Sequence, residues 1–493
     1  MAGSEDGDPS QSVIEYRMKV HLFGAGSSPG CANFALKKAA DDGEEEFGTE
    51  AAEFIRNDFY VDDGLTSVPT VDEAVELMKA SQKICAKAGL KLHKLVSNKR
   101  EVLEAFPTEE RAKAVQDLDL EIDVLPLERV LGVTWCIQSD SFQFRVELQD
   151  RPVTRRGILS TVSSIYDPTG FVAPFTLKGK QILQELCRDK LDWDSPIPED
   201  LKSKWEKWRT EVLDLEKIEV SRCYKPNDFG TVKAVELHHF SDASVGGYGQ
   251  CSYVRLVNQQ DKTHCSFVMG KARVTPLKQL TIPKLELAAA VLSARISDLL
   301  RSELTYNLTR DIFWTDSKVV LGYVKNESRR FHVYVANRVQ QIRDLSRPDA
   351  WRYVKTDENP ADEASRGKSP KQLIEESQWL RGPAFLWRDG VFEDLETEDF
   401  QLDPTDPEVK KVGSFKTSGS SSAGLLKSDR FKHFSSWSRA RRVVALCLRL
   451  KARLKERSVK NCKSTSTSEP GASSLTVAEI KGSGKSNDPL CTA

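Results

Sequence analysis

The chain has 493 residues, of which 39% are hydrophobic, and this is enough for several packed cores and excludes global disorder. Its 72 Lys and Arg balance 73 Asp and Glu, so net charge says nothing about a nucleic-acid partner. The polar start at Met1 to Ser10 lacks the apolar run of a signal peptide, and no stretch approaches the roughly 18 apolar residues of a membrane span. The ten cysteines form no C-x-x-C pair or zinc-ligand spacing, which is typical of a reducing compartment. We expect an intracellular protein, cytoplasmic or nuclear, that is not secreted and has no membrane partner.

The first half of the chain alternates helical patterns with short strands. Cys31 to Ala40 predicts a helix and Asp41 to Glu46 an acidic loop, while Phe54 to Asp63 and Gly64 to Val68 predict two short strands that meet at a turn. Val71 to Ala88 has helical spacing. The further elements expected in this half are a hairpin over 127–146 and helices over 157–167, 177–190 and 200–216.

From Val232 the pattern changes to strands. Three are expected in succession, and a long helix from Pro283 to Leu304 follows, in which Pro283 suits the first turn. The expected elements of this half are strands over 235–240, 247–256 and 265–274, the long helix, a strand over 311–314, helices over 317–324 and 333–345, and a strand over 351–354. This order predicts a mixed sheet with helices on its faces.

Four carboxylates occupy special places in this pattern. Asp242 ends the first strand in Ser241-Asp242-Ala243-Ser244, and Glu286 lies in the first turn of the long helix. Asp316 ends the fourth strand in Trp314-Thr315-Asp316-Ser317, and Asp362 lies in Asn359-Pro360-Ala361-Asp362. Carboxylates held close together repel one another unless cations lie between them. Hard divalent ions with oxygen ligands serve this purpose, and two ions about 4 Å apart can hydrolyse a phosphodiester.

Each carboxylate also has a simpler interpretation. Asp242 and Asp316 could cap helices, Glu286 could be a solvated acid favoured by the helix dipole, and Asp362 could cap a turn. His238 and His239 are better explained as strand residues than as metal ligands. The four acids in this order, each on a suitable element, favour a shared metal site with Asp242, Glu286, Asp316 and Asp362 as ligands.

These three strings and a fourth, Pro283-Lys284-Leu285-Glu286-Leu287, resemble the ribonuclease H domain of retroelements, and more narrowly that of BEL/Pao long-terminal-repeat retrotransposons. The resemblance implies a ribonuclease H-like mixed sheet with helices on both faces. It also implies Mg²⁺-dependent, or alternatively Mn²⁺-dependent, cleavage of RNA in RNA–DNA hybrids, with all four acids as catalytic metal ligands. Many relatives carry a His in the loop before the fourth carboxylate. Here Val354-Lys355-Thr356-Asp357-Glu358 contains none.

A second resemblance precedes this one. Phe59-Tyr60-Val61-Asp62-Asp63-Gly64, with the patterns around it, is similar to the palm of a reverse transcriptase, and implies Tyr60, Asp62 and Asp63 as remnants of its metal site. A plain acidic hairpin is the alternative. A palm also needs an aspartate on an earlier strand, and none of the acids before Ser27 follows an apolar strand. We therefore expect that the chain does not polymerise DNA alone, although a partner chain could supply the missing half.

The fold class expected is therefore α/β and α+β in several domains. These are a disordered start (1–14), a partial reverse-transcriptase palm (15–150), a helical region like a thumb or connection (151–228), a ribonuclease H-like domain (229–367), a weakly structured linker (368–430), a basic helix (431–460) and a disordered tail (461–493). The basic helix is better explained by a solvated charged face than by phosphate binding. The rival to a hybrid-cleaving enzyme is a catalytically inactive, nucleic-acid-binding remnant of a transposon protein.

Overall fold

The protein is described by a computed structural model that covers residues 2–3, 14–15, 24, 26–61, 63–116, 127–130, 133–390, 402–403, 405–410 and 441–451. It divides the chain into two units, Met1–Lys410 and Lys411–Ala493. The tail expected at 461–493 and most of the start expected at 1–14 lie outside the described residues. No helix within these described ranges has the length and apolar character needed to cross a bilayer.

The amino-terminal part is built mainly from helices that share one small core. Its elements are β1 (Ala2–Gly3), β2 (Ile14–Glu15), α1 (Ser28–Phe47), α2 (Thr49–Asn57), β3 (Phe59–Tyr60), β4 (Asp63–Gly64), α3 (Val71–Lys87), α4 (Arg100–Glu104), η1 (Thr108–Glu110) and α5 (Lys113–Gln116). The apolar faces of α1, α2 and α3 pack together around Ala40, Ile55 and Ile84. The helix expected at Val71 to Ala88 is confirmed.

Two expectations in this part are wrong. The acidic run expected as a loop continues α1 to Phe47, because Asp41 and Glu44 both bind Arg56 of the neighbouring helix α2. Phe54 belongs to α2 and is buried, so the hairpin is reduced to β3 and β4. Local propensity was outweighed in both places by packing between helices.

A four-stranded antiparallel sheet and three helices follow. These elements are β5 (Leu127–Val130), β6 (Val133–Cys136), β7 (Ser141–Gln143), α6 (Arg155–Ser164), α7 (Ala173–Arg188), α8 (Glu199–Glu211), η2 (Val212–Lys217) and β8 (Glu219–Ser221). The sheet has the order β5-β6-β7-β8. Phe175 of α7 stacks on Trp208 of α8 with ring centroids 4.9 Å apart, so the two helices form one packed pair.

The largest sheet has five strands in the order β11-β10-β9-β12-β13. Its elements, with the helices and turns that join and follow them, are β9 (Val232–Ala243), β10 (Gly247–Asn258), β11 (Thr263–Val274), α9 (Ile282–Glu303), β12 (Arg310–Thr315), α10 (Lys318–Lys325), α11 (Val333–Leu345), η3 (Pro348–Ala350), β13 (Trp351–Tyr353), η4 (Thr356–Glu358), α12 (Ala361–Arg366), α13 (Pro370–Glu375) and η5 (Ala384–Trp387). The strands β9, β10 and β11 are antiparallel, whereas β12 runs parallel to both β9 and β13. The expected mixed sheet is confirmed, and its parallel pairing brings the ends of β9 and β12 to one edge.

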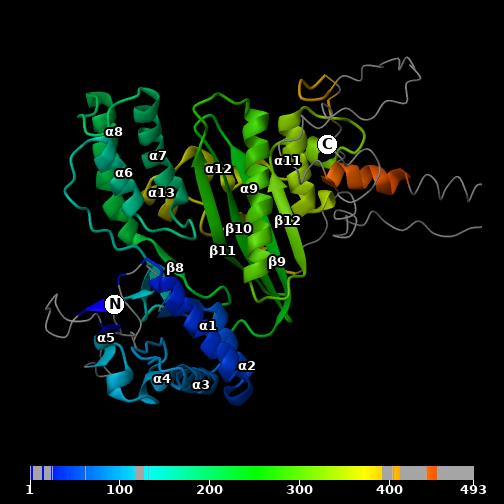
Figure 1. Cartoon of the computed structure of the whole chain (residues 1–493). Helices are drawn as coiled ribbons and strands as arrows, with labels where there is room; N and C mark the ends of the chain where they lie inside the picture. Colours follow the sequence, from blue (N-terminus) through cyan, green and yellow to red (C-terminus); the bar gives the residue numbers. More distant parts are fainter. Residues whose placement is uncertain are drawn as a thin grey trace, which may run out of the picture. The chain divides into compact units, whose positions relative to one another are not determined.

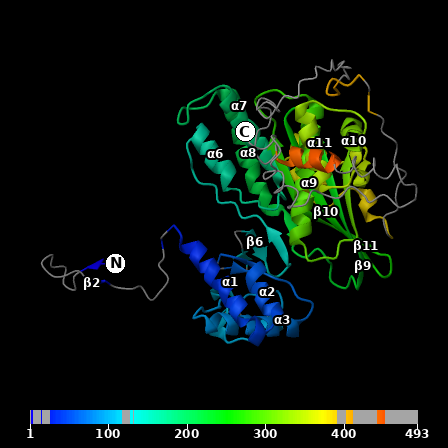
Figure 2. The same ribbon diagram turned by 45° about the vertical axis from the view of Figure 1, so that its right-hand side comes forward.

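Helices cover both faces of this sheet. Helix α9 lies on one face of the sheet (Figure 1). Its Leu292 and Ile296 share a hydrophobic core with Leu237 and Leu256 of the strands. Helices α9, α10 and α11 lie side by side (Figure 2). The other face packs against α7 and α12 in a core that runs from Ile158 to Leu386. One hydrophobic core therefore joins residues on both sides of position 229, where the sequence predicts that one domain ends and the next begins.

The carboxy-terminal unit contributes one described helix, over residues 441–451. Ala445 is buried, whereas Val443, Leu446 and Leu450 are exposed. The helix expected over 431–460 is thus helical where it is described, and its remaining residues lie outside the described part.

The buried ion pair of Arg255 and Glu236 also binds the segment that follows α13 to the sheet. Arg255 of β10 is 1% exposed and donates to Glu236 of β9 at 2.7 Å. The same guanidinium donates to the backbone carbonyls of Leu386 at 2.8 Å, Arg388 at 2.6 Å and Gly390 at 2.7 Å. Its planar fork therefore satisfies several acceptors that would otherwise be buried without a donor.

We predict that Arg255→Ala lowers the free energy of unfolding by about 3–5 kcal/mol, because Glu236 and the carbonyls would stay buried without their partner. Lys233→Ala removes an exposed ion pair with Asp261 and is the control, which should change the free energy of unfolding by less than about 1 kcal/mol. Chemical denaturation followed by circular dichroism measures both. Similar small changes in the two variants would show that the Arg255 network contributes little.

Candidate metal centre

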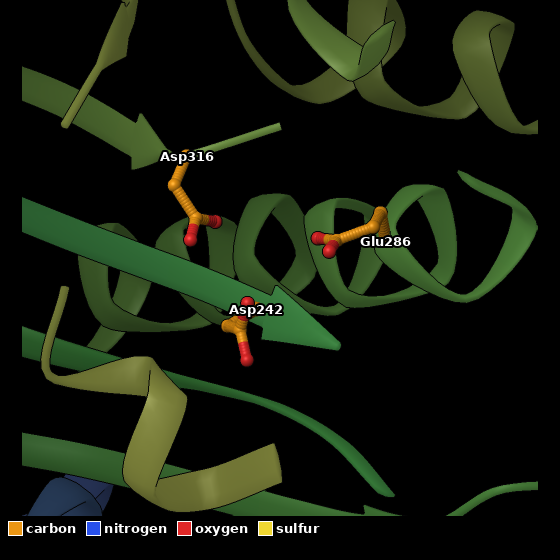
Figure 3. A group of neighbouring side chains, drawn as sticks. All are labelled: Asp242, Glu286 and Asp316. Carbon is orange, nitrogen blue, oxygen red and sulfur yellow. The ribbon is translucent and has the colours of Figure 1, made fainter. Parts of the chain in front are cut away.

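Three acidic side chains converge at the edge where β9 and β12 end. Asp242 is the penultimate residue of β9, Asp316 directly follows β12, and Glu286 lies in the first turns of α9. Figure 3 shows Glu286 reaching from its helix toward the two aspartates. Each of the three offers one carboxylate oxygen, and these oxygens lie within 4.8 Å of one another. Asp242 and Glu286 are buried, and Asp316 is half-buried.

Neutral donors hold two of these carboxylates in place. The Ser365 hydroxyl of α12 donates to Oδ2 of Asp242. Asp316 accepts from Thr356 Oγ1 at 2.8 Å and from Asn359 Nδ2 at 3.3 Å. None of these donors carries a charge, so the bonds orient the aspartates without neutralising them.

One oxygen of Glu286 has no such partner. No described residue donates to its buried Oε2. Burial raises the pKa of Glu286 to about 9, and the charges of Asp242 and Asp316 add to the effect. Burial also raises the pKa of Asp242 to about 6, although the Ser365 hydroxyl acts in the opposite direction.

The carboxylate oxygens of this group are suited to binding divalent cations. A buried acceptor without a donor is costly, and so is a cluster of unpaired carboxylates. A hard cation such as Mg²⁺ relieves both, because it takes carboxylate oxygens as ligands. Asp242, Glu286 and Asp316 are therefore the residues that could hold it.

Asp362 lies near this group but is turned toward another partner. Its carboxylate forms an ion pair with Arg366 of the same helix, with Oδ1 2.6 Å from Nε. Asp242 still feels its charge, since Asp362 contributes to the raised pKa of Asp242. Burial raises the pKa of Asp362 itself, and Arg366 opposes this. The structure thus brings three of the four expected carboxylates together and places the fourth beside them.

The loop in which a His is expected contributes Thr356 instead. Thr356, Asn359 and Ser365 were not expected as site residues, and all three donate to the carboxylates. Asn359 and Ser365 flank Asp362 in the string Asn-Pro-Ala-Asp-Glu-Ala-Ser, so the sequence contained a signal for them. Thr356 carries no comparable pattern.

The two histidines of β9 are structural in this fold. Both are fully buried. His238 Nδ1 accepts a hydrogen bond from Trp314 Nε1 at 3.1 Å, while His239 lies 2.7 Å from Ser252 Oγ and 2.8 Å from Asp311. Both rings therefore bind side chains of neighbouring strands in the same sheet.

The palm-like string forms a small hairpin. Tyr60 pairs with Asp63 across β3 and β4, and both side chains are exposed. Asp62 lies outside the described residues. Among the residues that the structure describes, acids gather into a group suited to metal only at Asp242, Glu286 and Asp316.

The sequence family that matches this region is the Pao retrotransposon-like RNaseH-like domain, over residues 154–317. The matched span includes Asp242, Glu286 and Asp316, and it ends before Asp362. It also starts at α6 and so runs across position 229, as the hydrophobic core does. This part of the chain is therefore similar to a retrotransposon ribonuclease H-like domain.

Two solved structures are similar to part of the chain. The N-terminal RNase H domain of rv2228c from Mycobacterium tuberculosis, a fusion with maltose-binding protein, has 15% identity and a TM-score of 0.21, and the match covers 27% of this chain and 91% of that one. RNase H1 from the halophilic archaeon Halobacterium salinarum NRC-1 has 11% identity and a TM-score of 0.18, and the match covers 29% of this chain and 99% of that one. Among curated proteins, none matches this sequence.

We predict that Glu286→Gln stabilises the metal-free protein at pH 7 by about 1–3 kcal/mol. A carboxyl with a raised pKa binds its proton more tightly in the folded than in the unfolded state. Folding stability is therefore lost as pH rises from the ordinary range of a glutamate toward about 9, and the amide removes this loss. Thermal unfolding in EDTA from pH 5 to pH 9 measures the difference, which should widen with pH.

In saturating Mg²⁺ the wild-type protein should be more stable than Glu286→Gln, because only the carboxylate can bind the ion strongly. A difference that stays constant across the pH range would show that Glu286 is not destabilised by its surroundings.

Proposed function

We propose that the five-stranded sheet with its helices is a metal-dependent ribonuclease that cleaves the RNA strand of RNA–DNA hybrids. The observation that carries the proposal is the convergence of Asp242, Glu286 and Asp316, with one buried oxygen of Glu286 left without a donor. The similarity of residues 154–317 to the Pao ribonuclease H-like domain supports the choice of substrate.

Bound divalent ions would activate the attacking water and stabilise charge on the leaving oxygen of the phosphodiester. Asp242, Glu286 and Asp316 would hold these ions, with Mg²⁺ expected and Mn²⁺ as the alternative. Asp362 joins the ligand set in this proposal once its carboxylate turns away from Arg366. Glu286 must give up its proton when cations bind, so cation binding and deprotonation are linked.

The surrounding side chains prepare the site before substrate arrives. Ser365 holds Asp242, while Thr356 and Asn359 hold Asp316, so neither aspartate has to be reoriented during the reaction. Asp242 and Asp316 lie on or next to strands of one sheet, and this limits their movement relative to each other. Such preorganisation is the main way in which a protein of this kind lowers a reaction barrier.

We predict that the wild-type protein cleaves an RNA–DNA hybrid in Mg²⁺ and that Asp242→Asn lowers the rate at least about 100-fold, because even the partners of metal ligands are worth about 10–100-fold. Gel analysis of a hybrid labelled on its RNA strand measures both. EDTA should abolish cleavage, and Mg²⁺ should restore it.

Asp298→Asn is the matched control, since Asp298 is exposed near the far end of α9 and pairs with Arg301. It should cleave like the wild type. A folded wild-type protein that binds the hybrid but leaves it intact would refute the enzymatic proposal and support the inactive, nucleic-acid-binding alternative.

The amino-terminal hairpin supports no comparable proposal for polymerase activity by the chain alone. Asp62 and Asp63 together offer too few ligands to fix two ions, and an earlier aspartate is required. We propose that a reverse-transcriptase reaction, if this region takes part in one, needs that aspartate from a partner chain.

Primer extension with a primed RNA template tests this point. We predict no DNA synthesis by the isolated chain under conditions in which it cleaves hybrids. Robust extension that is lost in Asp63→Asn would show that the chain carries a complete polymerase site.

A further inference from the structure

Three lysines gather where α7, α8 and the end of α12 meet. Lys178 lies on α7, Lys207 on α8, and Lys368 two residues beyond α12. In the described part of the chain none of the three forms an ion pair. Lys178 and Lys368 are half-buried, and Lys207 is exposed.

Packing holds these lysines in place. The side chain of Lys178 lies along Gly367, where a Cβ would meet its Cγ at 2.9 Å. The backbone N–H of Lys368 donates to the carbonyl of Pro174 in α7 at 3.4 Å. Helix α8 is fixed on α7 by Trp208, whose Nε1 donates to the carbonyl of Phe175 at 3.1 Å. The cluster therefore belongs to a packed surface.

The lysines influence one another electrostatically. Burial lowers the pKa of Lys178; the charge of Glu211 opposes this, and Lys207 and Lys368 each lower the pKa further by a smaller amount than Glu211 raises it. Bringing cations together in a half-buried place is unfavourable unless an anion offsets them. This arrangement is suited to a phosphate.

The cluster is also close to the metal centre. Lys368 follows Ser365 by three residues, so their Cα atoms are at most about 11 Å apart. Ser365 in turn donates to Asp242. The charge of Lys368 reaches Asp362, where it opposes the rise in pKa that burial causes. A nucleic-acid strand with its scissile phosphate at the carboxylates could place another phosphate at the lysines a few nucleotides away.

We propose that Lys178, Lys207 and Lys368 form a phosphate-binding surface for the backbone of the RNA–DNA hybrid. This inference rests on the proposed function, since it takes the hybrid as the ligand. It gives α7 and α8 a role in holding substrate, in addition to the packing of α8 on α7 and of α7 on the sheet. Lysines act on phosphate as point charges, so the surface would bind the backbone without reading its sequence.

The test is binding of a fluorescently labelled RNA–DNA hybrid, measured by anisotropy from about 50 to 200 mM salt. All proteins carry Asp242→Asn, so that binding is measured without cleavage. The triple variant K178Q/K207Q/K368Q should bind at least about tenfold more weakly at low salt. Its slope of log affinity against log salt should be shallower by about 2 to 3, because up to three phosphate contacts are lost.

Lys204→Gln is the matched control, because Lys204 lies on the same helix α8 but pairs with Glu185 at 3.0 Å. It should keep both the affinity and the slope. The triple variant K178R/K207R/K368R should keep most of the slope, since it retains the charge. Circular dichroism and thermal unfolding of each variant show whether the fold is preserved.

With the wild-type aspartate restored, the triple Gln variant should raise KM and leave kcat nearly unchanged. Unchanged affinity and salt slope in a folded triple Gln variant would overturn the inference, even if the wild type cleaves hybrids. Lysine-dependent binding of the hybrid by a protein that never cleaves it would uphold the inference and refute the enzymatic proposal.

Discussion

Mutual repulsion among three carboxylates is the constraint on which the site depends. Asp242, Glu286 and Asp316 bring their oxygens within 4.8 Å of one another in a largely buried place. Isolated acids would avoid this arrangement, so the rest of the fold must hold them there. Burial raises the pKa values of Glu286 and Asp242, and the charges of the neighbouring acids add to this rise, so a cation is strongly favoured at this edge of the sheet.

Packing on both faces of the sheet holds the three carboxylates together against this repulsion. Helix α9 is held on one face by its apolar side chains, and this fixes the position of Glu286. On the other face, α7 and α12 share one core with the sheet, and α12 delivers Ser365 to Asp242. Burying large apolar surfaces stabilises the fold enough to tolerate an unfavourable cluster, which is a common compromise at functional sites.

The sequence patterns predicted most of the large sheet. Alternation and helical spacing located β9 to β13 and α9 to α11 to within a few residues, because these segments are long and strongly periodic. The amino-terminal part was less predictable. There α1 extends through its acidic run because Arg56 binds Asp41 and Glu44, and this contact depends on a helix that follows later in the chain.

By itself, the sequence determined which acids lie at strand ends and at a helix start, since these positions follow from local periodicity and from turn residues. Only the tertiary structure decided which of them meet. Asp362 lies in as clear a motif as the others, but its carboxylate pairs with Arg366, one helical turn away. Thr356 has no motif and yet donates to Asp316, because the parallel pairing of β12 with β13 brings the loop after β13 to that carboxylate. Contacts between residues far apart in the chain depend on strand order and helix packing, which local patterns do not specify.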